Sequence, residues 1–312
     1  MENEKIKTPT VTAVKHRYGY ACINMGMAEK GVTCNRTMVY KTFKDRGTTY
    51  AGELALSNLV ALQQILRWNV ANKIEVYRMT SNLFPWASEY KFESLPNWSD
   101  ILPVMEEIGK FCDQHNLRLS FHPGPYNSLG SPDEEVILST QKDLEVHSRI
   151  MDFMGRPCSH EAKINIHLGG AYGNKERALK RFEQNFKRLS KSLRSRLTLE
   201  NDDREAMYSV GDLYKAHEAT GIAIVFDGHH WQIGAKSGTY QEDLLKAYKT
   251  WGSVTPTLHW SNSRSKWEDP TAKPTAHSDW YYETMALPNL NCDIILESKM
   301  KERALIKYRG NL

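Results

Sequence analysis

Seven short apolar runs in the sequence each end on a side chain that can bind a metal ion or contact a substrate. A buried parallel strand is apolar along its whole length, so a polar residue at its last position points out of the carboxyl edge of the sheet. These terminal residues are Asn24, His122, His167, Glu200, Asp227, His259 and Glu297. Imidazoles and carboxylates gathered at one edge are a common ligand set for divalent cations that activate water.

Two further histidines complete the candidate set, since His230 follows Asp227 in the segment FDGHHW and His277 lies in a later loop. The predicted metal ligands are His122, His167, Glu200, Asp227, His230, His259, His277 and Glu297. We expect Glu200, near the middle of the set, to bridge two ions, and we assign catalytic roles to Glu200, Asp227 and Glu297. Two metal ions bound about 3.5–4 Å apart can catalyse phosphodiester hydrolysis, so the residues predict a metal-dependent hydrolase.

The elements that must position these residues form a repeating pattern. An eighth apolar run, residues 74–79, leads into a polar segment, and stretches with helical periodicity separate the runs at residues 54–70, 101–115, 132–153, 176–193, 210–219 and 241–251. Strands alternating with helices predict parallel βαβ units, and eight units favour a closed barrel with its site at the C-terminal ends of the strands. We therefore predict an α/β fold, a single (β/α)8 TIM-barrel domain over residues 1–312. Residues 1–16 are expected to form a flexible or loosely attached segment, and residues 279–285 a short helix.

The composition argues against several classes of protein. No stretch approaches the roughly 20 apolar residues of a membrane span, and the opening MENEKIKTPT lacks the apolar segment of a secretion signal. Neither a GxGxxG motif nor a GKS or GKT phosphate loop is present, which disfavours nucleotide-binding folds. The five cysteines include no CxxC pair, so we expect reduced thiols in a cytoplasmic protein.

Charge and aromatic content bear on the substrate. The net charge of +4 is compatible with a polyanionic partner without requiring one, and the basic stretch 175–196 has the periodicity of an outer helix with a solvated cationic face. The predicted strand-end loops contain the aromatic residues Tyr20, Trp86, Tyr126, Tyr172, Trp231, Trp260 and Trp267. Such side chains can stack on nucleotides turned out of a duplex or on sugars, and the composition leaves both open.

Several longer motifs surround these residues. They are RYGYACIN (residues 17–24), YRMTSNLFPWAS (77–88), LSFHPGPY (119–126), INIHLGG, LTLEND, VFDGHHW, LHWSNS and the triplet His277-Ser278-Asp279. In their order and spacing the chain resembles the ultraviolet damage endonucleases, DNA-repair enzymes that share the metal-barrel plan of endonuclease IV.

The resemblance implies two or three divalent ions on the eight ligands, most often manganese in the family, with zinc, magnesium or cobalt as alternatives. It implies hydrolysis of the phosphodiester immediately 5′ to cyclobutane dimers and 6-4 photoproducts, leaving a 3′-hydroxyl and a 5′-phosphate. The partner would be double-stranded DNA carrying such lesions, and the protein a cytoplasmic monomer without membrane contact, nucleoid-associated in a prokaryote. Tyr20, Asn24, Pro125 and Tyr126 match positions that face the damaged strand.

Three positions depart from the family's pattern. Pro125 stands where glutamine is usual, and a proline offers a rigid apolar wedge without a side-chain donor. Thr257 stands where some members carry a modified lysine, which bears on how many metals bind. Glu89 stands where a histidine is often found, as a substitute ligand or a solvated charge.

Two alternatives use the same residues. A metal-dependent sugar isomerase or epimerase on the same barrel would also combine carboxylates, histidines and aromatic walls, although such sites often use a strand-end lysine and none is obvious. A sugar- or DNA-binding barrel without catalysis would require broken metal ligands, and none of the candidates is broken.

Overall fold

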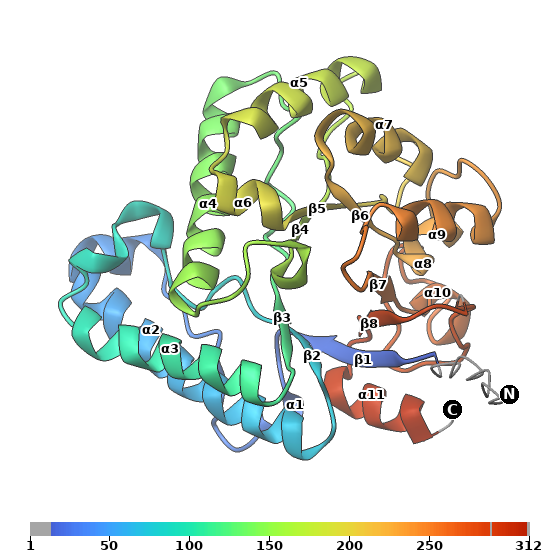
Figure 1. Cartoon of the computed structure of the whole chain (residues 1–312). Helices are drawn as coiled ribbons and strands as arrows, with labels where there is room; N and C mark the ends of the chain where they lie inside the picture. The colour runs from blue at the N-terminus through green and yellow to red at the C-terminus, as the bar shows by residue number, and fades with distance from the viewer. Residues whose placement is uncertain (1–13, 288, 311–312) are drawn as a thin grey trace, which may run out of the picture.

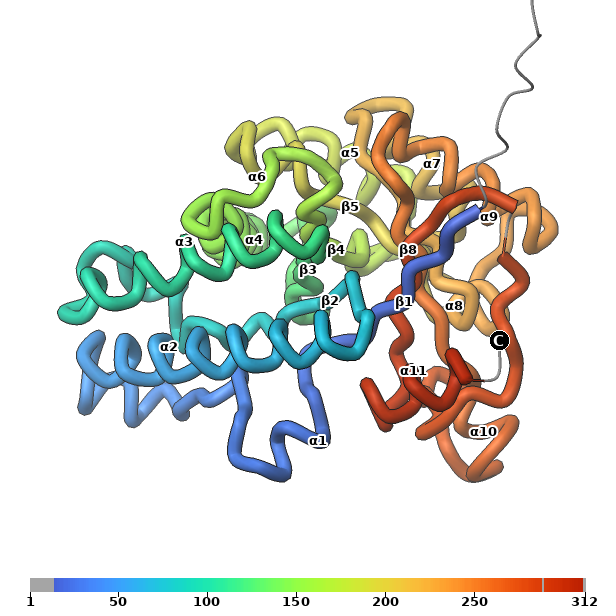
Figure 2. The backbone as a smooth tube through the Cα atoms, turned by 60° about the horizontal axis from the view of Figure 1, so that its bottom comes forward, coloured from blue at the N-terminus to red at the C-terminus, as the bar shows by residue number. Residues whose placement is uncertain are grey.

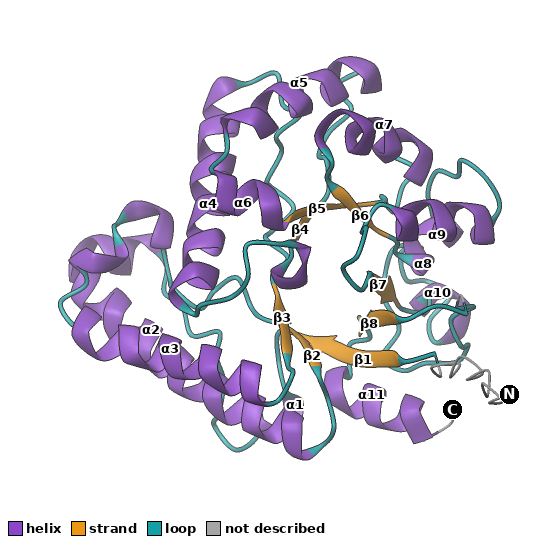
Figure 3. Cartoon of the chain, viewed as in Figure 1, coloured by secondary structure: helices purple, strands orange, loops and turns teal. Residues whose placement is uncertain are grey.

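The computed structural model describes residues 14–287 and 289–310. Its strands form an inner ring surrounded by helices (Figure 1, Figure 3). The strands are β1 (His16–Ala21), β2 (Val76–Arg78), β3 (Arg118–Ser120), β4 (Ile164–Ile166), β5 (Leu197–Glu200), β6 (Ala223–Val225), β7 (Thr257–Trp260) and β8 (Cys292–Leu296).

Two parallel sheets build this ring, one with the order β3-β2-β1-β8-β7 and one with the order β4-β5-β6. Isolated parallel bridges, Phe121–Ile164 and Asp227–His259, join them at both gaps. At the second gap the His259 amide donates to the Phe226 carbonyl across 2.9 Å. The strands therefore follow one another around a closed ring, and the predicted α/β TIM barrel is confirmed.

Helices cover the outside of the ring. The longer ones are α2 (Tyr40–Ala71), α3 (Trp98–Gln114), α4 (Glu134–Phe153), α5 (Lys175–Arg188), α7 (Val210–Thr220), α9 (Tyr240–Lys249) and α11 (Lys301–Gly310). The shorter ones are α1 (Met25–Ala28), α6 (Lys191–Arg196), α8 (Gly228–Ile233) and α10 (Arg264–Trp267), with single 3₁₀ turns at Ala87–Glu89, Phe92–Ser94 and His160–Ala162. In Figure 2, α2 and α3 lie side by side and extend to one side of the barrel. No helix in the described part of the chain has the length and hydropathy needed to cross a membrane.

Local sequence explains where several helices begin and end. Ser209 and Asp212 form a reciprocal capping box at the start of α7, and Thr239 and Glu242 form another at the start of α9. The helix α7 ends at Gly221, whose φ of 75° suits a residue without a Cβ. The two capping boxes fix where these helices begin, and Gly221 fixes where α7 ends before β6.

A buried ion network closes the amino end of the ring. Asp293 on β8 accepts hydrogen bonds from Arg17 on β1 (2.6 Å) and from Arg118 on β3 (2.8 Å). The Arg118 guanidinium also donates to the backbone carbonyls of Thr255 (2.6 Å) and His160 (2.7 Å). This network ties together strands far apart in sequence, opposite the end that carries the candidate ligands.

Some expected boundaries were wrong. The first strand ends at Ala21, because Cys22 adopts a φ of 67° and Asn24 instead caps α1. The helix expected over 176–193 is broken at Leu189, where Ser190 starts a new cap. Residues 279–285 form no helix, and the loosely attached segment expected over 1–16 cannot include His16, which opens β1; residues 1–13 lie outside the described residues.

Candidate metal centre

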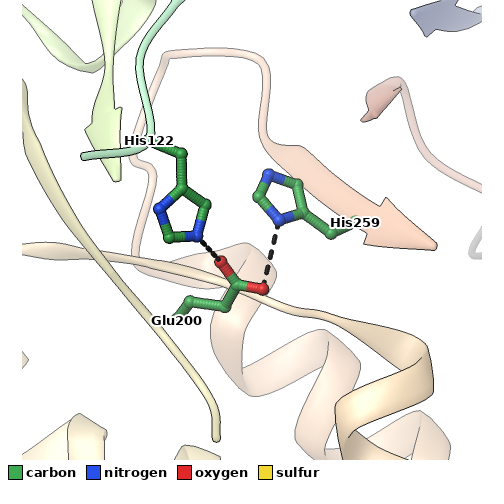
Figure 4. A group of neighbouring side chains, drawn as sticks. All are labelled: His122, Glu200 and His259. Carbon is green, nitrogen blue, oxygen red and sulfur yellow. Dashed lines mark hydrogen bonds and ion pairs between the residues drawn. The ribbon is translucent and has the colours of Figure 1, made fainter. Parts of the chain in front are cut away.

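Glu200, the last residue of β5, lies at the middle of the site and is fully buried. Its Oε2 is 3.0 Å from His122 Nε2, and its Oε1 is 3.1 Å from His259 Nδ1 and 3.3 Å from His230 Nδ1. Figure 4 shows two of these histidines converging on the carboxylate from different sides of the barrel. The fold thus brings together residues from four strand ends, as the sequence predicted.

Three groups of ligand atoms lie close enough to hold ions, each with all its atoms within 4.8 Å of one another. They are His122–Glu200–His259, His167–Glu200–His230 and Asp227–His259–Glu297. Seven of the eight predicted ligands therefore cluster. The eighth, His277, lines the same cavity of about 460 Å³ without joining a group.

The unsatisfied polar atoms of the site fit cations. Glu200 Oε1, Asp227 Oδ2, His259 Nδ1 and His277 Nδ1 are buried and have no hydrogen-bond partner of acceptable geometry within residues 14–287 and 289–310. A buried polar atom without a partner costs about 1–3 kcal/mol, and more when it is charged. Divalent ions would satisfy these mixed nitrogen and oxygen donors, a set suited to zinc, manganese or iron.

Charge within the cluster is unevenly balanced. Burial opposes ionisation of Glu200, but the neighbouring His259 and His122 hold the pKa of its carboxyl well below the usual range. Burial raises the pKa of Asp227 to about 7, and His230 offsets this only in part. A cation would favour the ionised form of both carboxyl groups.

The pKa values of the histidines are shifted in opposite directions. Burial lowers the pKa of His259 to about 4. Burial also opposes the charged form of His167, but Asp202, whose Oδ1 lies 3.3 Å from Nδ1, and Glu200 raise the pKa of His167 to about 9. Asp202 thus lies beside the His167 ring, in the place that an outer carboxylate commonly takes next to a histidine ligand.

Sequence reasoning missed polar residues inside the strands. Arg78 on β2 forms an ion pair with Glu297, and Asn165 on β4 donates to the Glu200 carboxylate. Lys163, almost fully buried, places Nζ 3.2 Å from His259 Nε2. A signal was present, because Lys163, Asn165 and His167 alternate with isoleucines, and alternate residues of a strand share one face.

The structure separates the predicted DNA-contact residues into two pairs. Tyr20 is buried and donates to Asn69 (2.7 Å), and the buried Asn24 donates to the Tyr20 hydroxyl (2.9 Å). Direct DNA contact by Tyr20 and Asn24 is therefore not supported, because interior packing occupies both side chains. Pro125 lines the cavity, and Tyr126 is 91% exposed.

The other two departures also have definite surroundings. Thr257 on β7 is buried beneath His259, and its hydroxyl has no hydrogen-bond partner within the described ranges. Glu89 lies 3.6 Å from Lys142 in a solvent-accessible ion pair and belongs to none of the three ligand groups. Glu89 therefore behaves as a solvated charge in this structure.

Comparisons with known proteins identify the family of this chain. Residues 16–312 match the family described as UV-endonuclease UvdE. A UV-damage endonuclease of Schizosaccharomyces pombe is 34% identical over 308 residues, 93% of this chain and 50% of the relative, so this chain spans about half that protein. A UV DNA damage endonuclease of Bacillus cereus is 31% identical over 312 residues, 95% of this chain and 94% of the relative. The crystal structure of SacUVDE matches with a TM-score of 0.82 and 30% identity, over 96% of this chain and 100% of that one. The chain belongs to the UV-endonuclease UvdE family.

Proposed function

We propose that this protein is a metal-dependent DNA endonuclease that hydrolyses the phosphodiester immediately 5′ to ultraviolet photoproducts. Its substrates would be cyclobutane dimers and 6-4 photoproducts in double-stranded DNA, and its products a 3′-hydroxyl and a 5′-phosphate. The observation that carries the proposal is the set of three neighbouring ligand groups, two of which contain Glu200 and two of which contain His259. Membership of the UV-endonuclease family is the reason for proposing DNA as the substrate and ultraviolet photoproducts as the lesions.

The three groups would hold two or three divalent ions, with manganese as the leading candidate. When bound, such ions supply an activated water and stabilise the departing 3′-oxygen. The chain's own residues keep the ligands in place: Arg78 pairs with Glu297, Lys163 contacts His259, and Asp202 faces His167.

Recognition of the lesion would fall to the loop after β3. Tyr126 projects into solvent, and Pro125 forms part of the cavity wall. A proline cannot donate from its side chain, so Pro125 would sense the shape of the distorted strand rather than a base edge. We expect the protein to act as a monomer, because a duplex must reach this open end of the barrel.

A nicking assay tests the proposal. Purified protein with manganese is incubated with irradiated and unirradiated supercoiled plasmid, with and without EDTA, and the cut is mapped on an oligonucleotide carrying one dimer. We expect damage-dependent, EDTA-sensitive nicking 5′ to the dimer, lost in Glu200→Gln and Glu297→Gln.

The matched control is Glu218→Gln, the same change at an exposed position of α7. Normal cutting by the Glu200 and Glu297 variants would contradict the mechanism. Turnover of a sugar without nicking would favour the isomerase or epimerase alternative instead.

A further inference from the structure

Tyr172 combines an unusual backbone with an exposed ring. It lies in the connection between β4 and α5, with a φ of 48° and a side chain 48% exposed. A bulky residue is rarely found in the left-handed region, and such strained positions cluster at functional sites.

The ring of Tyr172 is held at the edge of the metal cavity. A Cβ built on Gly170 would lie 2.9 Å from the ring, so the ring covers this glycine closely, and Gly170 lines the cavity beside His167. The Arg181 guanidinium lies 5.7 Å from the ring centroid. The ring therefore packs on a glycine of the cavity wall and lies near a cation, while about half of the side chain stays exposed.

The hydroxyl of Tyr172 reaches the loop that follows β3. It lies 3.1 Å from the Ser128 hydroxyl, two positions from the exposed Tyr126. At Gly169, which has a φ of 100°, a Cβ would lie 2.1 Å from Ser128 Oγ, so the two loops approach as only a glycine permits. Tyr172 is thus in contact with the segment that carries Pro125 and Tyr126.

Two more hydrogen bonds tie this loop to α5. Arg181 Nε donates to the Gly130 carbonyl (2.8 Å), and Asn185 donates to the Leu129 carbonyl (2.9 Å). The base of the loop is held from one side while Tyr126 at its tip remains free. Tyr172 sits where the fixed base meets the open cavity.

We propose that Tyr172 is a second aromatic contact for the damaged strand, which stacks against a nucleobase at the mouth of the cavity and positions the loop carrying Tyr126. The proposal rests on the proposed function and adds a residue to substrate recognition. Stacking of one base on an aromatic side chain changes affinity by about ten- to a hundredfold.

Three variants separate the ring from the hydroxyl. Tyr172→Asn removes the ring and keeps a residue type that tolerates the left-handed backbone, whereas Tyr172→Phe and Ser128→Ala remove only the contact between the two hydroxyls. Binding of the manganese-loaded protein is measured by fluorescence anisotropy, with a dimer-containing duplex whose scissile linkage cannot be hydrolysed and with the intact duplex. Metal content and melting temperature are measured on the same samples.

We expect Tyr172→Asn to weaken binding to the damaged duplex at least about tenfold, with manganese content and intact-duplex binding unchanged. Tyr172→Phe and Ser128→Ala should each cause a smaller loss of discrimination, and the double variant should lose no more than either alone. Tyr214→Asn, on the outer helix α7, is the matched control.

Wild-type discrimination by Tyr172→Asn would overturn the proposal. If that variant does not fold, Tyr172→Gly takes its place, because it also removes the ring and suits the left-handed backbone, and wild-type discrimination by it would overturn the proposal equally. Failure of the wild-type protein to nick irradiated DNA would instead refute the proposed function, so the two failures are distinguishable.

Discussion

At the scale of single residues, the ligands are shared unequally among the three groups. Glu200 and His259 each belong to two groups, whereas His167 belongs to one. Removing a shared ligand should therefore weaken binding at two positions, and removing an unshared ligand should weaken binding at one.

This sharing gives a test by metal content. We expect Glu200→Gln and His259→Gln to lower the bound manganese per protein more than His167→Gln does, measured by mass spectrometry after dialysis. His115→Gln, a change at the exposed C-cap residue of α3, serves as the control and should keep the wild-type content. Equal losses in the three site variants would show that the groups do not act as separate positions.

The pKa of Asp227 predicts how metal binding depends on pH. Burial raises the pKa of this carboxyl to about 7, so in the ion-free protein it becomes protonated as pH falls through neutrality. A ligand must lose its proton before it binds a cation. Manganese affinity should therefore fall as pH is lowered, by up to about tenfold per pH unit below the pKa.

Calorimetric titration with manganese at about pH 6, 7 and 8 measures this dependence. Asp227→Asn should bind more weakly and show a flatter profile, because its amide does not titrate. Any slope that remains belongs to other groups, such as His167, whose pKa is raised to about 9. An unchanged profile in the variant would contradict the assignment to Asp227.

Residues at strand ends could be predicted from the sequence, whereas residues inside strands could not be ranked. His122 and Glu200 follow apolar runs, and this position alone indicates the carboxyl edge of a sheet. Arg78 lies within such a run and Lys163 directly before β4, and at either place a charged residue can face the inner or the outer side of the barrel. Their roles depend on side-chain contacts that only the folded ring creates.

At the scale of elements, the network around Asp293 should matter for stability. Asp293→Asn would leave the buried Arg118 and the partly buried Arg17 without their carboxylate, and breaking a buried ion pair in this way costs about 3–5 kcal/mol. Urea unfolding should show this loss of unfolding free energy.

The control for this change is Glu176→Gln, which breaks an ion pair with Lys215 in which both side chains are more than half exposed. Exposed pairs contribute about 0–1 kcal/mol, so the control should unfold nearly as the wild type does. Equal unfolding free energies in the two variants would show that the network around Asp293 does not stabilise the fold more than an exposed ion pair does.

Element types followed from periodicity, but boundaries depended on local contacts. The strand β5 (Leu197–Glu200) ends at Glu200, as the position of this residue after a short, mainly apolar run predicts. The expected end of β1 was wrong because the polar side chain of Asn24 marks a helix cap as readily as a strand end. The sequence alone does not distinguish a helix cap from a strand end, because the distinction depends on how far the partner strand extends.

At the scale of the whole molecule, ions should stabilise the fold as well as support cutting. A ligand that binds the folded state alone adds about 2.7 kcal/mol at a hundredfold excess over its Kd. We expect EDTA to lower the melting temperature by several degrees and manganese to restore it, as measured by differential scanning fluorimetry. Glu200→Gln should lose most of the manganese-dependent shift, and a full shift in that variant would contradict the location of the ions.

The circular order of the strands was predictable, because eight alternating units leave few other arrangements. The two bridges that join the sheets were not, because each depends on the backbone positions of residues beyond the regular strand ends. Phe121 and Asp227 lie just after β3 and β6, where sequence shows only the end of an apolar run.

The bridge between Asp227 and His259 joins the wall of the barrel through two residues whose side chains would also hold an ion. Loss of the ions should therefore weaken the pairing between β6 and β7 and leave the pairing between β3 and β4 intact. Hydrogen exchange at the His259 amide should quicken when the ions are removed, while exchange at the Asn165 amide, beside the Phe121 bridge, should change little. In the ion-free protein the pairing between β6 and β7 would then be weakened, and we expect proteases to cleave the chain first between these two strands.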